Sequence, residues 1–234
     1  MNDKTSSAGS CKVVILTMDT HLNSAAMKSR ESLTRLAPKL SFCIHSASEF
    51  SIDEQKLSRV KVDIATADIV IVTMLFLEDH FKPILADLEA RRDQCAAMVC
   101  IMSAAEVVKL TRMGSLDMSK PSTGPMAFLK KLRGNKPQAG QDASAGAKQM
   151  KMLRRLPQIL RFVPGTAQDL RAYFLTLQYW LGGSQENIHN LVVFLLDRYA
   201  KHVFTKGSVK VGDPVEYPEV MDVYMRSQRD AEFN

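Results

Sequence analysis

Hydrophobic residues in the first hundred positions alternate between two periodicities. Four short runs are continuously apolar and rich in β-branched residues, as expected of strands buried on both faces of a parallel sheet: 13–18, 40–46, 69–74 and 97–102. Apolar positions also recur every three or four residues, which predicts helices over 22–36, 53–65, 78–92 and 104–112. This strand–helix alternation predicts an α/β fold, an open doubly wound parallel sheet of the flavodoxin-like type, followed by a helical segment.

The pattern changes after residue 112. Residues 113–148 are rich in Gly, Pro and small polar residues, which predicts a flexible loop. Apolar stripes then return, with a predicted C-cap at Gly182-Gly183 and an N-cap at Ser184. We therefore divide the chain into an α/β domain over 12–112, a basic Gly/Pro-rich loop over 113–148, a helical region packing on or beside the sheet over 149–204, and a tail over 205–234 for which truncation stays open.

The positive charge of the chain is confined to one segment. The 31 Lys and Arg residues exceed the 25 Asp and Glu residues by six, but residues 112–162 alone carry 11 basic and 2 acidic side chains. Such a segment is either a solvated linker with a basic helix or a dock for an anion, such as a carboxylated ligand, an acidic partner or a membrane surface. Nucleic acid is the weakest partner, because only Phe128 precedes the last residue of this segment as an aromatic stacking platform.

Composition and missing motifs exclude several classes of protein. With 46% hydrophobic and 24% charged residues, the chain is an ordinary globular protein. No apolar run reaches the roughly 18 residues of a membrane span, and the four cysteines form no C-x-x-C pair, which favours reduced thiols in a cytoplasmic protein. The chain lacks a P-loop, a G-x-G-x-x-G turn, an H-E-x-x-H helix and a G-x-S-x-G elbow, so a self-contained ATPase, dehydrogenase, zinc protease or hydrolase is disfavoured.

Polar residues at the carboxyl ends of the predicted strands are candidates for a binding cleft, because ligands of open α/β sheets bind there. They are Asp19, His21, Glu78, His80 and Ser103. The carboxylates and imidazole of residues 78–80 have the chemistry to bind a metal or move a proton. Consecutive residues of a helix, however, point about 100° apart, and acidic residues in a first turn are favoured by the helix dipole alone. We therefore assign no catalytic residue and no metal site.

Four segments of the chain have distinctive amino-acid sequences. They are VVILTMDTHL (13–22), DIVIVTMLFLEDH (68–80), MSAAEVVKLTRMGSLDMSKPSTGPMAFLKKLRG (102–134) and QMKMLRRLPQILRFVPGTAQDLRAYFLTLQYWLGGSQENIHNLVVFLLDRYA (149–200). These segments resemble the amino-terminal region of the magnesium chelatase large (H) subunit family, and more distantly the cobaltochelatase large subunit. The resemblance extends from about residue 12 to residue 220.

This resemblance implies a role in (bacterio)chlorophyll biosynthesis. The family inserts Mg²⁺ into protoporphyrin IX while two smaller, separate subunits hydrolyse ATP, which agrees with the missing P-loop. The implied partners are those two ATPase-type subunits, protoporphyrin IX and the magnesium-protoporphyrin methyltransferase that acts downstream. The resemblance assigns no cofactor to this region itself. Because the family members are several times longer and no catalytic residue carries over, the isolated chain is expected to be inactive.

Protoporphyrin is a flat apolar ring with two propionates, so its host needs aromatic walls and a few cations. The candidate ligand-binding residues that combine these properties are Lys151, Arg154, Arg155, Tyr173 and Trp180. A core position for Trp180 on its apolar stripe is the competing interpretation. Two other functions also stay open, a non-catalytic module that binds a tetrapyrrole or docks a partner, and a cobaltochelatase relative.

Overall fold

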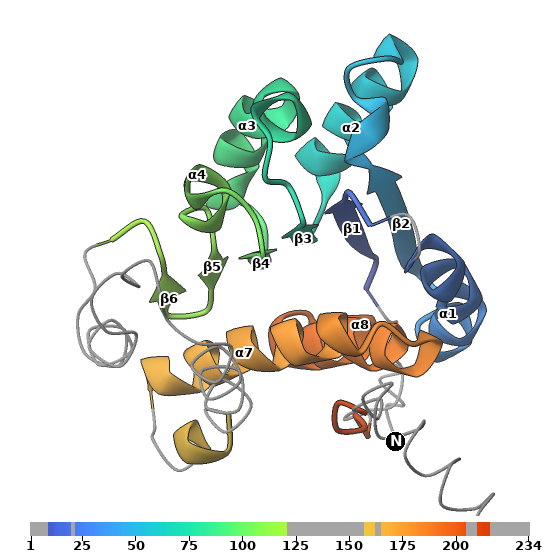
Figure 1. The fold of residues 1–234 in the computed structure, drawn as a ribbon. Coiled ribbons are helices and arrows are strands. Elements are labelled where there is room, and N and C mark those ends of the chain that lie inside the picture. The colour runs from blue at the N-terminus through green and yellow to red at the C-terminus, as the bar shows by residue number, and fades with distance from the viewer. Residues whose placement is uncertain (1–8, 20–21, 121–156, 162–164, 205–209, 216–234) are drawn as a thin grey trace, which may run out of the picture.

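A computed structural model describes residues 9–19, 22–120, 157–161, 165–204 and 210–215 of the chain. Within these ranges, one sheet lies between two layers of helices, as Figure 1 shows. The α/β architecture predicted from the sequence is therefore confirmed.

Six strands form the sheet in the order β2-β1-β3-β4-β5-β6. Their bounds are β1 Cys11–Thr17, β2 Leu40–Ser46, β3 Ile69–Thr73, β4 Ala97–Ile101, β5 Arg112–Met113 and β6 Leu116–Asp117. The first four strands pair in parallel, whereas β5 and β6 pair antiparallel at one edge. The sheet is thus mixed rather than wholly parallel, which corrects one detail of the predicted fold.

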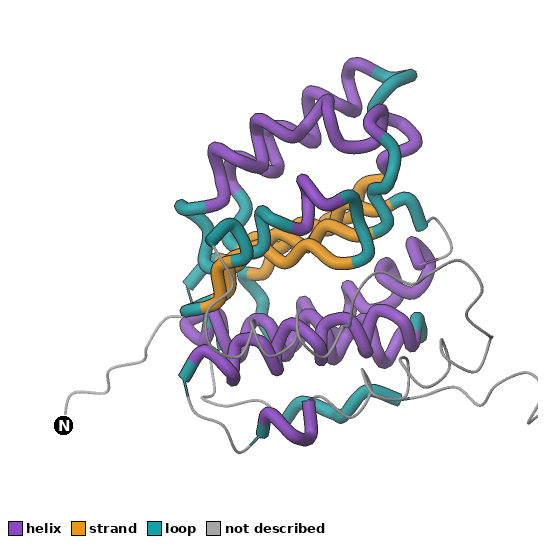
Figure 2. Tube along the Cα trace, turned by 60° about the vertical axis from the view of Figure 1, so that its left-hand side comes forward, coloured by secondary structure: helices purple, strands orange, loops and turns teal. Residues whose placement is uncertain are grey.

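Helices cover both faces of this sheet (Figures 1 and 2). Three helices pack against one face of the sheet and share a hydrophobic core cluster with it. They are α1 (Leu22–Leu36), α7 (Thr166–Gly182) and α8 (Gln185–Tyr199). The opposite layer contains α2 (Glu54–Thr66), α3 (Glu78–Arg92) and the short α4 (Ala105–Val108). Two 3₁₀ turns, Ala47–Glu49 and Lys201–Val203, and a helical turn over 157–160 are also described. The two C-terminal helices therefore pack on the sheet as part of the same core.

Burial on both faces explains the continuous apolar runs of the central strands. All five residues of β3 and all five of β4 are buried, so neither strand shows the alternation of a strand with one solvated face. The helices α7 and α8 form a hairpin on one face of the sheet, and the residues that connect them stabilise it. Gly183 adopts the left-handed conformation at φ 60°, and Ser184 Oγ accepts a hydrogen bond from the Asn187 N–H at 3.0 Å.

The helix predicted over 104–112 is much shorter in the structure. It spans Ala105–Val108, after which the chain turns back to pair with β4. Thr111 holds this turn, because its hydroxyl bonds both the N–H and the carbonyl of Cys100 at 3.1 Å. The hairpin of β5 and β6 then occupies the start of the predicted loop, and 121–148 and the predicted helix 149–156 lie outside the described residues.

All four cysteines are free, as the sequence predicts, and three of them are buried. Among the helices that the structure describes, none has the length and apolar character needed to cross a membrane.

Candidate functional site

The carboxyl-end edge of β3 and β4 carries the clearest signs of a functional site. Met74 and Met102, which follow these two strands, have φ angles of 63° and 46°. Residues other than glycine and asparagine rarely adopt this left-handed backbone conformation. Residues strained in this way cluster at functional sites. The Met74 N–H donates a hydrogen bond to the Met102 carbonyl at 2.9 Å, so the two strained residues are joined directly through their backbones.

Ser103, one of the candidates from the sequence, ties the two strand ends together. Its hydroxyl donates to the Ile101 carbonyl at 3.0 Å and accepts from the Leu75 N–H at 3.2 Å. The Leu75 carbonyl in turn accepts from the Ala104 N–H at 2.8 Å. Ser103 is therefore a structural residue of this edge, with its hydroxyl committed to the backbone.

Two buried polar atoms near this edge have no hydrogen-bond partner among the residues that the structure describes. They are Thr73 Oγ1, at the end of β3, and His80 Nδ1, in the first turn of α3. Leu77, the N-cap of α3, provides no side-chain hydrogen bond to the helix. Buried polar groups are normally paired, so both atoms are exceptions to this rule.

The outer surface of the edge is apolar and acidic. Phe76 and Leu77 are 55% and 62% exposed, although large apolar side chains are usually buried. Beside them, Glu78 bonds Lys82 and raises the pKa of that lysine, to which Asp79 and Glu106 also contribute by their charge. Three carboxylates thus lie close enough to Lys82 for their charges to act on it.

The remaining cleft candidates are placed less closely together. Asp19 follows β1, and its N–H donates to Thr17 Oγ1 at 2.9 Å. Glu78 and His80 lie in the first turn of α3, whereas His21 lies outside the described residues. Among the described residues of this edge, no three His, Cys, Asp or Glu side chains converge in a metal-binding arrangement. The described candidates, Asp19, Glu78, His80 and Ser103, therefore all follow the carboxyl ends of their strands.

The candidates for porphyrin binding divide between the core and the part of the chain that is not described. Trp180 is 3% exposed and lies in the core. The Tyr173 hydroxyl donates to the Cys100 carbonyl at 3.2 Å, and burial raises the pKa of this phenol. Both rings are committed to packing in this structure. Lys151, Arg154 and Arg155 lie outside the described residues, and their role in binding stays a prediction.

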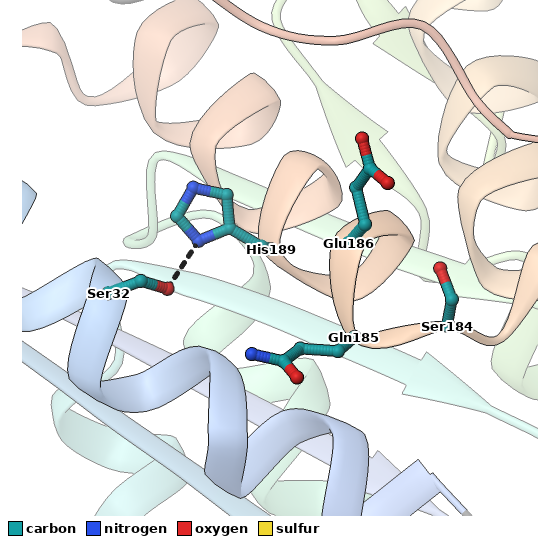
Figure 3. A pocket seen from close by; sticks show the side chains of 5 residues that line it. All are labelled: Ser32, Ser184, Gln185, Glu186 and His189. Carbon is teal, nitrogen blue, oxygen red and sulfur yellow. Dashed lines mark hydrogen bonds between the residues drawn. The ribbon is translucent and has the colours of Figure 1, made fainter.

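A shallow pocket between α1 and α8 brings together a serine and a histidine that the sequence analysis did not pair (Figure 3). Ser32 Oγ lies 2.9 Å from His189 Nδ1, but it also donates to the Ser29 carbonyl at 2.8 Å. The hydroxyl proton therefore points to the backbone, whereas a nucleophilic serine shares its proton with the base. Glu186 does not point toward the imidazole in Figure 3, so a third group that orients the base is missing from the pocket lining. The contact joins two helices rather than forming a catalytic pair.

Comparison with known proteins gives one consistent result. A family model described as a domain of unknown function (DUF3479) matches residues 12–174. The chain is 44% identical to the magnesium-chelatase H subunit of Rhodobacter capsulatus over 213 residues, which cover 91% of this chain and 18% of that protein. The H subunit of Cereibacter sphaeroides is also 44% identical, over 89% of this chain and 17% of its own length. The chloroplastic ChlH subunit of Oryza sativa subsp. indica is 32% identical over 70% of this chain and 12% of its own length.

The chain spans less than a fifth of the length of these relatives. The match to the first relative includes nine-tenths of the chain, so it extends over both the sheet and the two C-terminal helices. The chain therefore belongs to the DUF3479 family, and it is the counterpart of the amino-terminal region of the magnesium-chelatase H subunit.

Proposed function

We propose that this chain acts as the amino-terminal, non-catalytic domain of a magnesium chelatase large subunit. The whole complex inserts Mg²⁺ into protoporphyrin IX in (bacterio)chlorophyll biosynthesis, with ATP hydrolysis on two smaller subunits. The observation that carries this proposal is the 44% identity to two bacterial H subunits over most of the chain. Because the named relatives are magnesium chelatase subunits, magnesium is favoured over cobalt as the inserted metal.

The residues of the chain support a helper role rather than catalysis. The P-loop that would bind ATP is missing from the sequence, and the Ser103 hydroxyl at the carboxyl-end edge is hydrogen-bonded to the backbone. We infer that ATP hydrolysis and metal insertion take place on other parts of the complex. We propose a cytoplasmic location for this chain, as for the bacterial complex.

The carboxyl-end edge is better suited to a polypeptide than to protoporphyrin. Phe76 and Leu77 provide apolar surface for a contact, and the adjacent carboxylates would repel the two propionates of the porphyrin. We therefore propose that this edge contacts another part of the chelatase complex, either the remainder of the large subunit or a smaller subunit.

Domain exchange tests the proposed function. The matching segment of the Rhodobacter capsulatus H subunit is replaced by this chain, and magnesium insertion is measured with the two smaller subunits and ATP. We expect activity in the exchanged protein and none in the isolated chain. Insertion of magnesium by the isolated chain would contradict the non-catalytic role.

Porphyrin binding by this chain stays a separate prediction with its own test. The full chain is titrated with a soluble porphyrin while the porphyrin absorbance band is followed. A saturable band shift that is lost on joint replacement of Lys151, Arg154 and Arg155 by alanine would place part of the porphyrin site here. A flat response of the folded chain would locate that site in other parts of the complex.

A further inference from the structure

Three side chains with metal-binding chemistry converge on the edge strand β2, away from the site described above. Cys43 and His45 are two residues apart on this strand, so they lie on the same face of the sheet. That face is covered by α2, which contributes Asp63. The ligand atoms of the three side chains all lie within 4.8 Å of one another.

The contacts of Asp63 hold this cluster in place. Its Oδ2 atom lies 2.8 Å from His45 Nε2, and its Oδ1 atom accepts a hydrogen bond from Lys12 Nζ at 2.7 Å. Lys12 is itself fixed by a second hydrogen bond, to Thr66 Oγ1 at 2.7 Å. The side chains of His45 and Asp63 are each 16% exposed, so the cluster is largely shielded from water.

We propose that Cys43, His45 and Asp63 form a binding site for Zn²⁺. A thiolate, an imidazole and a carboxylate are all ligands of zinc, which takes four of them in tetrahedral geometry. Bonds of about 2.0–2.3 Å would place the ligand atoms roughly 3.3–3.8 Å apart, so the present cluster needs an adjustment of about 1.5 Å at most. Three protein ligands leave the fourth position to water.

The ligand set selects against the metal ion that the chelatase relatives are named for. Mg²⁺ binds through oxygen atoms in octahedral geometry, and it has little affinity for sulfur. The site is therefore distinct in its chemistry from any site that delivers magnesium to a porphyrin.

Lys12 acts on this site as a supporting residue. When Asp63 binds the metal through one oxygen, its other oxygen keeps the hydrogen bond to the Lys12 ammonium, as metal-bound carboxylates commonly do. Zinc displaces the proton of the Cys43 thiol, so one proton is released for each ion bound. Burial and, to a smaller extent, the charge of Asp63 raise the pKa of this thiol to about 11, although Lys12, Arg59 and Arg30 act in the opposite direction.

Zinc at this position would join the edge strand to the helix that follows it. β2 has a neighbour on one side only, β1, and its outer edge is free among the described residues. A metal ion bound to residues 43, 45 and 63 links β2 to α2. Because the site exists only in the folded state, metal binding stabilises that state.

Cobalt titration of the full, reduced chain tests the proposal. Co²⁺ replaces zinc in such sites, and its bond to a thiolate produces a charge-transfer absorption band. We expect this band to saturate at one equivalent, to disappear when one equivalent of Zn²⁺ is added, and to persist in a large excess of Mg²⁺. The variants Cys43→Ala, His45→Gln and Asp63→Asn should each bind cobalt at least tenfold more weakly.

The matched control is Cys95→Ala, which removes a buried thiol outside the cluster and should leave the band unchanged. Circular dichroism establishes that each variant is folded. If Cys43→Ala does not fold, His45→Gln and Asp63→Asn carry the comparison. A folded chain without the charge-transfer band, or a band of full strength in Cys43→Ala, overturns the proposal. Neither result bears on domain exchange, so this site and the proposed function fail separately.

Discussion

Asp169 joins three separate elements of the molecule through its carboxylate. From the first turn of α7, its Oδ2 atom accepts hydrogen bonds from the Ser115 N–H and hydroxyl, both at 2.8 Å. Its Oδ1 atom accepts from Arg198 Nη2 at 2.9 Å and from the Tyr199 hydroxyl at 3.0 Å, both on α8. The β5–β6 hairpin is thereby fastened to the helical layer.

Asp169→Ala should lower the free energy of unfolding by about 3 kcal/mol, because it leaves the partly buried Arg198 without its partner. Urea denaturation measures the change. The control Glu89→Ala, at an exposed position of α3, should stay within about 0.5 kcal/mol of the parent chain. Equal losses in the two variants would contradict the role assigned to Asp169.

Acid should destabilise the fold through the same residue and through Asp117. Burial alone would raise the pKa of Asp169, but hydrogen bonds from Ser115, Arg198 and Tyr199 lower it overall. Burial also acts to raise the pKa of Asp117, yet Ser119 and Arg92 bring it down to about 2. Because both pKa values are depressed in the folded state, their stabilisation is complete above the unfolded value of about 3.9 and is lost as the pH falls below it.

The free energy of unfolding should therefore decrease between about pH 5 and pH 2. It is measured by urea denaturation at a series of pH values, and Asp169→Asn should show a shallower decrease than the parent chain. An identical pH dependence in both would show that Asp169 contributes nothing to it.

The helical hairpin shows how far local sequence determines an element. The apolar stripe of α7, the glycine pair at 182–183 and the cap at Ser184 are visible in the sequence, and the structure places the joint there. The end of α4 was not visible, because it depends on the pairing of Thr111 with Cys100 across the fold. Likewise, the spacing of Cys43 and His45 in the sequence places both on one face of a strand. Only the packing of α2 on that face brings Asp63 next to them.

At the scale of this element, Gly183→Ala should destabilise the hairpin by about 1 kcal/mol. A β-carbon is disfavoured at the φ of 60° that Gly183 adopts, where its N–H closes α7 onto the Trp180 carbonyl at 3.0 Å. Gly183→Asn is the matched variant, since asparagine tolerates this conformation better. Thermal unfolding should rank the parent first, then Gly183→Asn, then Gly183→Ala. An alanine variant as stable as the parent would argue against the assigned cap.

At the scale of the whole molecule, the sheet and its two helical layers form a scaffold that presents one edge. The parallel pairing of the first four strands was predictable from the strand–helix alternation, which requires crossover connections. The exposure of Phe76 and Leu77 was not, because both are large apolar residues that closely follow a predicted buried strand. The chain leaves the sheet at Met74, and this turn carries the two side chains out to solvent.

Joint replacement of Phe76 and Leu77 by serine should leave the free energy of unfolding nearly unchanged, since both side chains are already exposed. In the exchanged H subunit, the same replacement should slow magnesium insertion, because the proposed contact surface loses its apolar groups. The control Val62→Ser alters a residue on α2 that is 62% exposed, as Leu77 is. Equal insertion rates for the two variants would exclude this edge as a contact surface.

The initial rate of magnesium insertion by the exchanged H subunit tests the central claim most directly. Three proteins are compared with the same smaller subunits, ATP and porphyrin: the parent Rhodobacter capsulatus protein, the same protein without the matching segment, and the protein that carries this chain in its place. If the chain is the amino-terminal domain of a magnesium chelatase large subunit, the exchanged protein should be at least tenfold faster than the deleted one. A folded exchanged protein that is no faster than the deleted one would contradict the account.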